Sequence, residues 1–215
     1  MNGFVLEHQV TGPLHTNCYL LFDKESKEAA LFDVGGKIDR LVSIIEEENL
    51  KIKYFFFTHL HFDHFNGINK IKKKFPEALI AYNKNELVVL ENQGFFARIF
   101  QVDPSIIENL EFEVEDNQTL NLSNIEIKTI LAPGHTPGSI CYYFNGCILT
   151  GDVLFRSGIG RTDLYGGSYE VLLNSINKLM ELPDETKVYP GHGDFTDIGT
   201  EKKENPFIVS GDILR

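Results

Sequence analysis

Four side chains able to bind a metal ion lie within six consecutive positions of this chain: His59, His61, Asp63 and His64. Imidazole nitrogens and carboxylate oxygens together are ligands for zinc, iron or manganese. The four residues follow the apolar run Tyr-Phe-Phe-Phe at 54–57, which is typical of a buried strand. We therefore expect them on a loop at the end of that strand, where functional residues are common.

Three further candidate ligands occur in similar local sequences. His135 lies in Ala-Pro-Gly-His-Thr-Pro-Gly, His192 in Tyr-Pro-Gly-His-Gly, and Asp152 in Thr-Gly-Asp. Each of them follows a strand-like run, so four strand ends in total deliver imidazole or carboxylate groups. If these strands are neighbours, their ends meet at one edge of the structure. A single loop histidine would mean little, but the repetition indicates a shared metal site.

The elements that must position these residues can be predicted from apolar patterning. Alternating and continuous apolar runs predict strands at 4–10, 17–22, 29–33, 52–57, 78–82, 112–114, 118–122, 125–131, 139–144, 147–150 and 187–189. Apolar residues at helical spacing predict helices at 38–49, 66–75, 84–91 and 168–180. Both halves place strands first and helices after. We therefore predict one α/β domain spanning 1–215, a pseudo-symmetric two-sheet sandwich with helices outside.

Composition narrows the range of partners and locations. The formal net charge of −11 argues against nucleic acid and against an anionic membrane surface as partners. Cys18, Cys141 and Cys147 form no Cys-x-x-Cys pair and lie in apolar settings, so we expect buried, reduced thiols. The N-terminus lacks a signal-peptide pattern, and no apolar run reaches 18 residues. These features predict a cytoplasmic protein. Its oligomeric state is not predicted.

On these motifs the chain resembles the metallo-β-lactamase-fold hydrolases, specifically their single-domain, glyoxalase-II-like (hydroxyacylglutathione hydrolase-like) branch. The resemblance extends from Thr-Asn-Cys-Tyr at 16–19, through Asp-Val-Gly-Gly at 33–36 and Thr-His-x-His-x-Asp-His, to Glu-Asn-Pro at 204–206. It implies a four-layer αββα sandwich with two divalent metal ions at one end. We expect zinc, with iron or manganese as alternatives. It also implies that His59, His61 and His135 bind one ion, that Asp63, His64 and His192 bind the other, and that Asp152 bridges both.

The implied activity is hydrolysis of small thioesters such as S-lactoylglutathione. Two metal ions sharing a hydroxide can attack the acyl carbonyl, with Asp63 orienting the hydroxide. A thiolate leaving group has a pKa of about 8.5 and needs little help from a general acid, which favours thioesters over amides. Arg161 matches the basic residue that binds a substrate carboxylate in glutathione-thioester hydrolases. The aromatic residue expected two positions later is replaced by Asp163.

Several alternatives remain open from the sequence. A persulfide dioxygenase with one iron is similar over much of the chain, and a lactonase would use the same hydroxide. A non-enzymatic metal scaffold is the alternative outside enzymes. Arg161 could instead form a structural ion pair with a nearby acid. The stretch 92–105, with Phe95, Phe96 and Phe100, is either a satellite hydrophobic cluster or the roof of a substrate cleft. His8 and His15 are expected to have no catalytic role.

Overall fold

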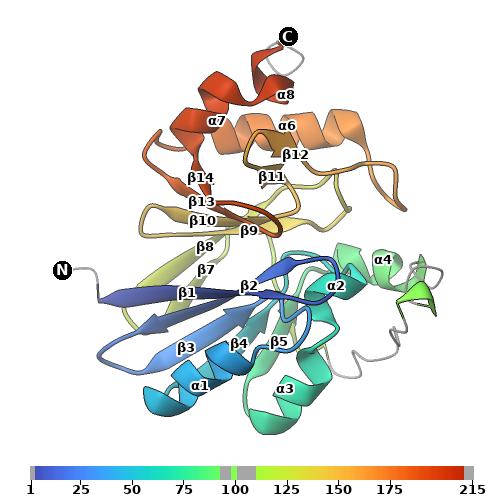
Figure 1. Ribbon diagram of the computed structural model, residues 1–215. Coiled ribbons are helices and arrows are strands. Elements are labelled where there is room, and N and C mark those ends of the chain that lie inside the picture. The colour runs from blue at the N-terminus through green and yellow to red at the C-terminus, as the bar shows by residue number, and fades with distance from the viewer. Residues whose placement is uncertain (1–2, 93–97, 101–109, 211–215) are drawn as a thin grey trace.

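Two six-stranded sheets packed face to face form the centre of the molecule in the computed structural model, which describes residues 3–92, 98–100 and 110–210 (Figure 1). The first sheet has the order β1 (Phe4–Thr11), β2 (Thr16–Asp23), β3 (Glu28–Phe32), β4 (Lys51–Phe56), β5 (Leu79–Tyr82) and β6 (Phe112–Glu113). The second has the order β14 (Thr196–Asp197), β13 (Lys187–Pro190), β10 (Cys147–Gly151), β9 (Ile140–Phe144), β8 (Ile125–Leu131) and β7 (Thr119–Leu122). A small hairpin, β11 (Leu154–Phe155) with β12 (Gly158–Ile159), lies outside both sheets.

Strand direction brings several strand ends to a common edge. In the first sheet β4 runs parallel to both β3 and β5, and this central position accounts for its apolar sequence. In the second sheet β8 is antiparallel to β9, β9 is antiparallel to β10, and β10 is parallel to β13. Therefore β8, β10 and β13 run in the same direction, and their C-terminal ends lie at the same edge of that sheet.

Helices cover the outer face of each sheet (Figure 1). The first sheet carries α1 (Asp39–Glu47) and α3 (Ile68–Lys74), and the second carries α6 (Tyr169–Met180), α7 (Ile198–Glu204) and α8 (Pro206–Val209). In α6 the residues Leu172, Ile176 and Leu179 are buried at helical spacing, and the side chain of Ser168 caps the N-terminus by accepting a hydrogen bond from the Val171 amide. The predicted helix at 168–180 is thus confirmed.

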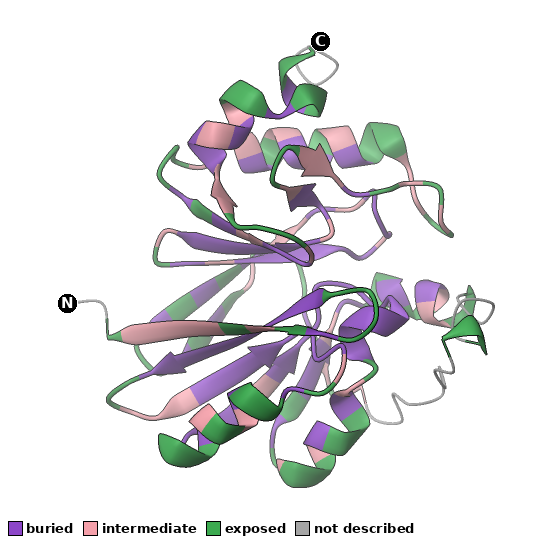
Figure 2. Cartoon of the chain, in the orientation of Figure 1, coloured by how far each residue is buried: buried purple, intermediate pink, exposed green. Residues whose placement is uncertain are grey.

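Three separate hydrophobic clusters correspond to the three interfaces of a four-layer structure. One lies between the first sheet and its helices and includes Phe55 and Leu41. A second lies between the sheets and includes Phe56 and Tyr142, whose ring centroids are 5.0 Å apart. The third lies under α6 and includes Ile148. Figure 2 shows the buried residues concentrated in these layers, so the predicted αββα sandwich is confirmed.

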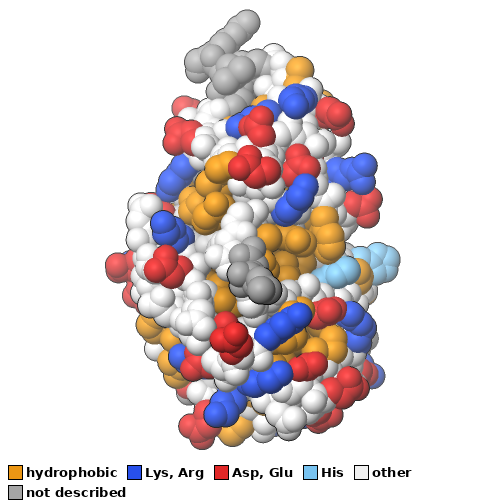
Figure 3. Space-filling view, turned by 90° about the vertical axis from the view of Figure 1, so that its left-hand side faces the viewer, with side chains coloured by type: hydrophobic (Ala, Val, Ile, Leu, Met, Phe, Trp, Pro, Cys, Tyr) orange, Lys and Arg blue, Asp and Glu red, His pale blue; other side chains and the backbone are white. Residues whose placement is uncertain are grey.

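The outer surface carries both signs of charge. Figure 3 shows Lys and Arg side chains intermixed with Asp and Glu on the face that it draws. Exposed ion pairs such as Lys27–Glu48, at 2.8 Å, join the two signs. Exposed pairs contribute only about 0–1 kcal/mol each, so the packed layers dominate the stability of the fold. In the described part of the chain, no helix is long and apolar enough to cross a bilayer.

Some elements differ from the sequence-based expectation. The helix predicted at 66–75 is preceded by a separate turn, α2 (Phe62–Phe65), and the helix predicted at 84–91 begins as a 3-10 turn, η1 (Lys84–Glu86), before α4 (Leu87–Asn92). The short β11, β12, β14, α7 and α8 were not expected, because two-residue strands and helices of only one or two turns show little measurable periodicity. All three cysteines are buried and free, as predicted.

Candidate metal centre

The first four candidate ligands follow β4, but only two of them lie on an irregular loop. His59 and His61 lie outside regular secondary structure, whereas Asp63 and His64 belong to α2. The expectation of a single loop was therefore wrong for the second pair. All four residues of the turn are buried, and its two ends are the apolar side chains of Phe62 and Phe65. Polar and apolar residues alternate in this stretch, which is typical of extended backbone. The sequence pattern therefore did not indicate a helical turn of only four residues.

The other three candidates come from the second sheet, one from each of the co-directional strands. His135 follows β8, Asp152 follows β10, and His192 follows β13. The ends of these strands approach one another so closely that position 191 must be glycine. A β-carbon there would collide with Oδ1 of Asp152 and would lie 2.8 Å from Cε1 of His64. Glycine before His192 is therefore a packing requirement of the site.

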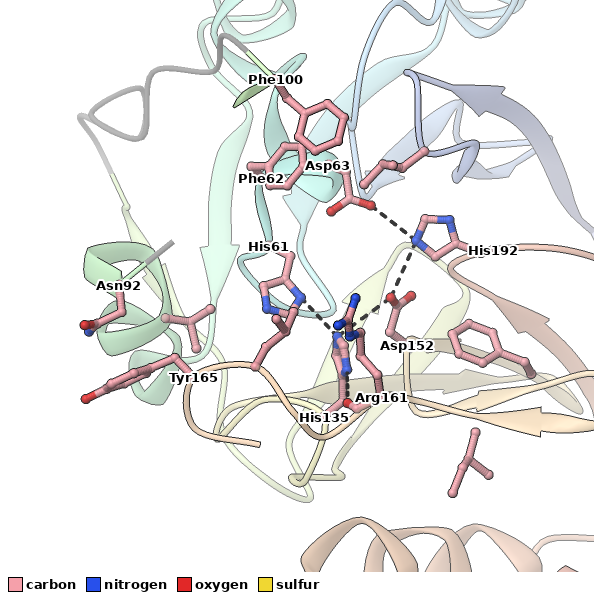
Figure 4. Close-up of a pocket in the computed structure, with 15 residues that line it drawn as sticks. His61, Phe62, Asp63, Asn92, Phe100, His135, Asp152, Arg161, Tyr165 and His192 are labelled. Atoms are coloured by element: carbon pink, nitrogen blue, oxygen red, sulfur yellow. Dashed lines mark hydrogen bonds and ion pairs between the residues drawn. The ribbon is translucent and has the colours of Figure 1, made fainter. Parts of the chain in front are cut away.

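The structure brings all seven side chains together. Each of three groups has ligand atoms that lie within 4.8 Å of one another: His59, His61, His135; His59, His64, Asp152; and Asp63, His64, His192. Nε2 of His135 lies 3.3 Å from Nε2 of His59 and 3.0 Å from Nδ1 of His61. Figure 4 shows His61 and His135 pointing toward one another across the cavity.

Asp152 lies between the first and the third of these groups. Its Oδ2 is 3.7 Å from Nε2 of His135 and 3.5 Å from Nε2 of His192, and its Oδ1 is 3.5 Å from Nε2 of His64. Nε2 of His192 also lies 3.2 Å from Oδ2 of Asp63 (Figure 4). A carboxylate in this position can contact cations on both sides.

Neighbouring groups orient the imidazoles through their second ring nitrogens. Nδ1 of His135 lies 2.8 Å from the carbonyl oxygen of Arg161, and a hydrogen bond of this kind fixes the tautomer and turns the other nitrogen toward a metal. Nδ1 of His64 forms an ion pair of 3.1 Å with Oδ2 of Asp33. Similarly, the Thr16 hydroxyl donates a hydrogen bond of 3.0 Å to Oδ2 of Asp63.

Protonation differs between the groups. Burial lowers the pKa of His135, lowers that of His61 to about 3, and lowers that of His59 well below its usual value. These three imidazoles are therefore neutral at pH 7 and have lone pairs available for a cation.

His64 and His192 behave in the opposite way. Burial opposes charge on His64, but three carboxylates outweigh it and raise its pKa well above the usual value: Asp152, Asp63 and Asp33. Burial likewise opposes charge on His192, but hydrogen bonds with Asp152 and Asp63 raise its pKa to about 9. A metal ion that binds His64 and His192 therefore displaces protons from their ring nitrogens.

The donor set fits divalent cations. Buried ring nitrogens of His59 and His61 both lie within 3.3 Å of Nε2 of His135, although a neutral imidazole has only one N–H to donate. Among the described residues, Nε2 of His64 and Oδ1 of Asp152 have no hydrogen-bond partner although both atoms are buried. Such groups are costly unless an ion satisfies them.

The candidate ligands open into a cavity of about 530 Å³, which is within the usual range for small-molecule sites. Much of the lining in the described part of the chain is apolar and includes Leu14, Phe62, Val89, Phe100, Phe155 and Ile159. Arg161 also lines the cavity (Figure 4). Its Nε and Nη2 atoms donate hydrogen bonds of 2.7 Å to the two carboxylate oxygens of Asp163.

The structure also shows where the phenylalanine at position 100 and the two remaining histidines lie. Phe100 lines the cavity and stacks on Phe62 with ring centroids 5.0 Å apart, whereas Phe95 and Phe96 lie outside the described residues. His8 and His15 are exposed and belong to none of the three ligand groups.

Sequence reasoning missed the site roles of two residues. Thr16 belongs to the motif Thr-Asn-Cys-Tyr, but a hydroxyl at the start of a strand did not indicate a role in the site. Asp33 stood in a recognised motif, but no role was attached to it. Its positive φ of 52° and its hydrogen bonds from the backbone amide and hydroxyl of Thr58 become visible only in the structure.

The family of the chain follows from comparison with known proteins. The family model described as "Metallo-beta-lactamase superfamily" matches residues 11–192. The chain belongs to the metallo-beta-lactamase superfamily. A divalent-metal site built from its His and Asp groups is characteristic of this fold.

Relatives and solved structures cover nearly the whole chain. "Probable metallo-hydrolase YqgX" of Bacillus subtilis is 37% identical, with 92% of this chain and 94% of the relative covered. "Hydroxyacylglutathione hydrolase GloC" of Haemophilus influenzae is 38% identical, with 90% and 93% covered. The structure of BLEG-1 B3 metallo-beta-lactamase superposes with a TM-score of 0.86 at 33% identity, covering 95% of this chain and 99% of that one. TTHA1623 in a di-iron-bound form gives 0.81 at 28% identity, covering 94% and 99%.

Proposed function

We propose that this protein is a hydrolase of small thioesters that uses two divalent metal ions, with zinc as the expected metal. The observation that carries the proposal is the arrangement of six ligand side chains in two groups of three on either side of a seventh, Asp152. Relatives named as metallo-hydrolase and hydroxyacylglutathione hydrolase support it. The di-iron form of TTHA1623 supports two ions and keeps iron as an alternative.

In this proposal each residue group has a separate task. His59, His61 and His135 would hold one ion, Asp63, His64 and His192 would hold the second, and Asp152 would supply a carboxylate to both. Divalent ions in such a site lower the pKa of water toward neutrality and polarise a carbonyl group.

The residues of the chain position the reactants. Asp63 lines the cavity and accepts a hydrogen bond from Thr16, so one of its oxygens is held in place while the carboxylate faces the substrate. From that position it orients the attacking water and accepts its proton. Arg161, on the cavity lining, binds a polar group of the substrate. The apolar lining excludes water from the remainder of the cavity.

The lining favours thioesters over amides. Among the described lining residues, the carboxylates are Asp63 and Asp152, and both belong to the ligand set. A carboxylic acid outside the ligand set, able to protonate an amine leaving group, is therefore missing from the described lining. A thiolate leaves without one, because its pKa is about 8.5.

The test is release of free thiol by metal-replete protein. We expect hydrolysis of S-lactoylglutathione or another small acyl thioester, and a content of two metal ions per chain by elemental analysis. Absence of thiol release across a panel of thioesters would contradict the proposal. Oxygen consumption with glutathione persulfide would indicate the dioxygenase alternative, and activity on lactones alone would indicate a lactonase. The buried free cysteines fit the proposed cytoplasmic location.

A further inference from the structure

A buried glutamate outside the ligand set connects the two loops that carry the first ligand group. Glu86 ends the turn η1 and is only 1% exposed. The turn itself is fixed at Asn83, whose side chain accepts a hydrogen bond from the Asn85 amide and donates one of 2.8 Å to the carbonyl of Val114. The backbone that carries Glu86 is therefore held independently of the candidate metal site.

The two carboxylate oxygens of Glu86 have different partners. Oε2 accepts a hydrogen bond of 2.8 Å from the amide of Leu60, which is the residue between His59 and His61. Oε1 accepts one of 2.7 Å from the amide of Gly138, three residues after His135. One side chain thus joins the loop after β4 in the first sheet to the loop after β8 in the second.

The loop at Gly138 packs closely against Glu86, so few other residues fit at either position. A β-carbon at Gly138 would lie 2.8 Å from Oδ1 of Asn83 and 2.9 Å from Cγ and Oε1 of Glu86. Glycine at this position therefore lets the loop approach the carboxylate. A glutamine at position 86 would have one oxygen for two amide donors, and its NH₂ group would face one of them.

Keeping an acid here is costly, because burial disfavours the charged form. Burial raises the pKa of Glu86 above its usual value, although hydrogen bonds from Thr136, Leu60 and Gly138 oppose that shift. An apolar side chain in this space would remove the acceptor of the amides of Leu60 and Gly138. The carboxylate accepts from both amides and thereby ties their two loops together.

We propose that Glu86 is a positioning residue that sets the distance between His135 and the pair His59 and His61. Nε2 of His135 lies 3.3 Å from Nε2 of His59 and 3.0 Å from Nδ1 of His61 in the structure. Glu86 touches neither substrate nor a ligand nitrogen, so it acts through the backbone. This inference rests on the metal site of the proposed function and extends it to a residue outside the ligands.

The test compares Glu86→Gln with a matched control, Glu201→Gln. Glu201 is also fully buried and also accepts a backbone hydrogen bond, from Ser157, but its partners do not line the cavity. Binding of Zn²⁺ alone is measured in competition with a chromophoric chelator, and the geometry of the site is followed through the visible spectrum of bound Co²⁺.

For Glu86→Gln we expect metal affinity to fall about tenfold or more, with an altered Co²⁺ spectrum. For Glu201→Gln we expect a lower melting temperature with unchanged affinity and spectrum. The proposal is overturned if Glu86→Gln lowers only the melting temperature. If that variant does not fold, Glu86→Asp is used, because its shorter side chain cannot reach both amides and the same change in metal binding is expected. Since these readouts need no substrate, a wild-type protein inactive on thioesters would refute the proposed function without affecting this result.

Discussion

At the scale of single residues, Asp152 connects the two proposed ion sites. Its oxygens lie 3.5–3.7 Å from imidazole nitrogens of His64, His135 and His192. The imidazoles are neutral ligands when a metal is bound, so the carboxylates must balance the cation charge. Asp152 and Asp63 are the carboxylates available for this among the candidate ligands.

Substitution of Asp152 by Asn tests the bridging role. The amide has nearly the same shape but no charge, so we expect both ions to bind less tightly and turnover to fall by about 10³-fold or more. Elemental analysis and thiol-release assays measure the two effects. Near-wild-type turnover with two ions per chain would falsify the bridging role.

Arg161 is the residue whose role has two competing explanations. Its bidentate pair with Asp163 is exposed, since the two side chains retain 59% and 67% of their surface, and a hydrogen bond from Arg161 lowers the pKa of Asp163 to about 2. Arg161→Ala and Asp163→Ala separate the explanations. If Arg161 binds substrate, its removal raises KM about tenfold with little change in kcat, whereas removal of Asp163 does not raise KM. Equal losses in both variants would show that the ion pair is structural.

At the scale of elements, the sequence predicted the long strands and helices and the strand ends that carry the ligands. It could do so because β4, β8, β10 and β13 have strong apolar patterns and because the Gly-Asp and Pro-Gly-His sequences mark their ends. It missed the helical turn α2, since four residues are too few for a period to be read. Glu86 was also missed, because an acid at the end of a short turn is usually exposed.

The two glycines around His192 give a matched test of how β13 delivers that ligand. An alanine β-carbon at Gly191 would meet Asp152 and His64, whereas one at Gly193 would meet nothing within 4 Å. Gly193 has a φ of +74°, so alanine there costs about 1 kcal/mol of backbone strain. We therefore expect Gly191→Ala to lose metal and activity and Gly193→Ala to keep most of both. Metal content and thiol release are the measurements, and equal behaviour of the two variants would contradict this account of the strand end.

At the scale of the whole molecule, the candidate site lies where the two sheets meet. His59, His61, Asp63 and His64 come from the first sheet and the remaining ligands from the second (Figure 1). Protein contacts already join the sheets beside the site, since the amide of Ile140 donates a hydrogen bond to the carbonyl of Thr58 and the hydroxyl of Tyr142 donates one to the carbonyl of Phe57. The sequence could predict two sheets from its repeated plan. The spacing between them depends on the side chains packed at their interface, which no local pattern encodes.

Because the ligands come from both sheets, metal binding should stabilise the whole fold. An ion that binds only the folded state adds about 4 kcal/mol at a thousandfold excess over its Kd. For a chain of 215 residues this corresponds to a rise in Tm of about 10 °C. Calorimetry of the protein after treatment with a chelator, and again after zinc is restored, measures the change, with Asp152→Asn as a control that should show a much smaller rise. An identical Tm with and without metal in the wild-type chain would mean that the ions do not link the two sheets, and that the site is held by protein contacts alone.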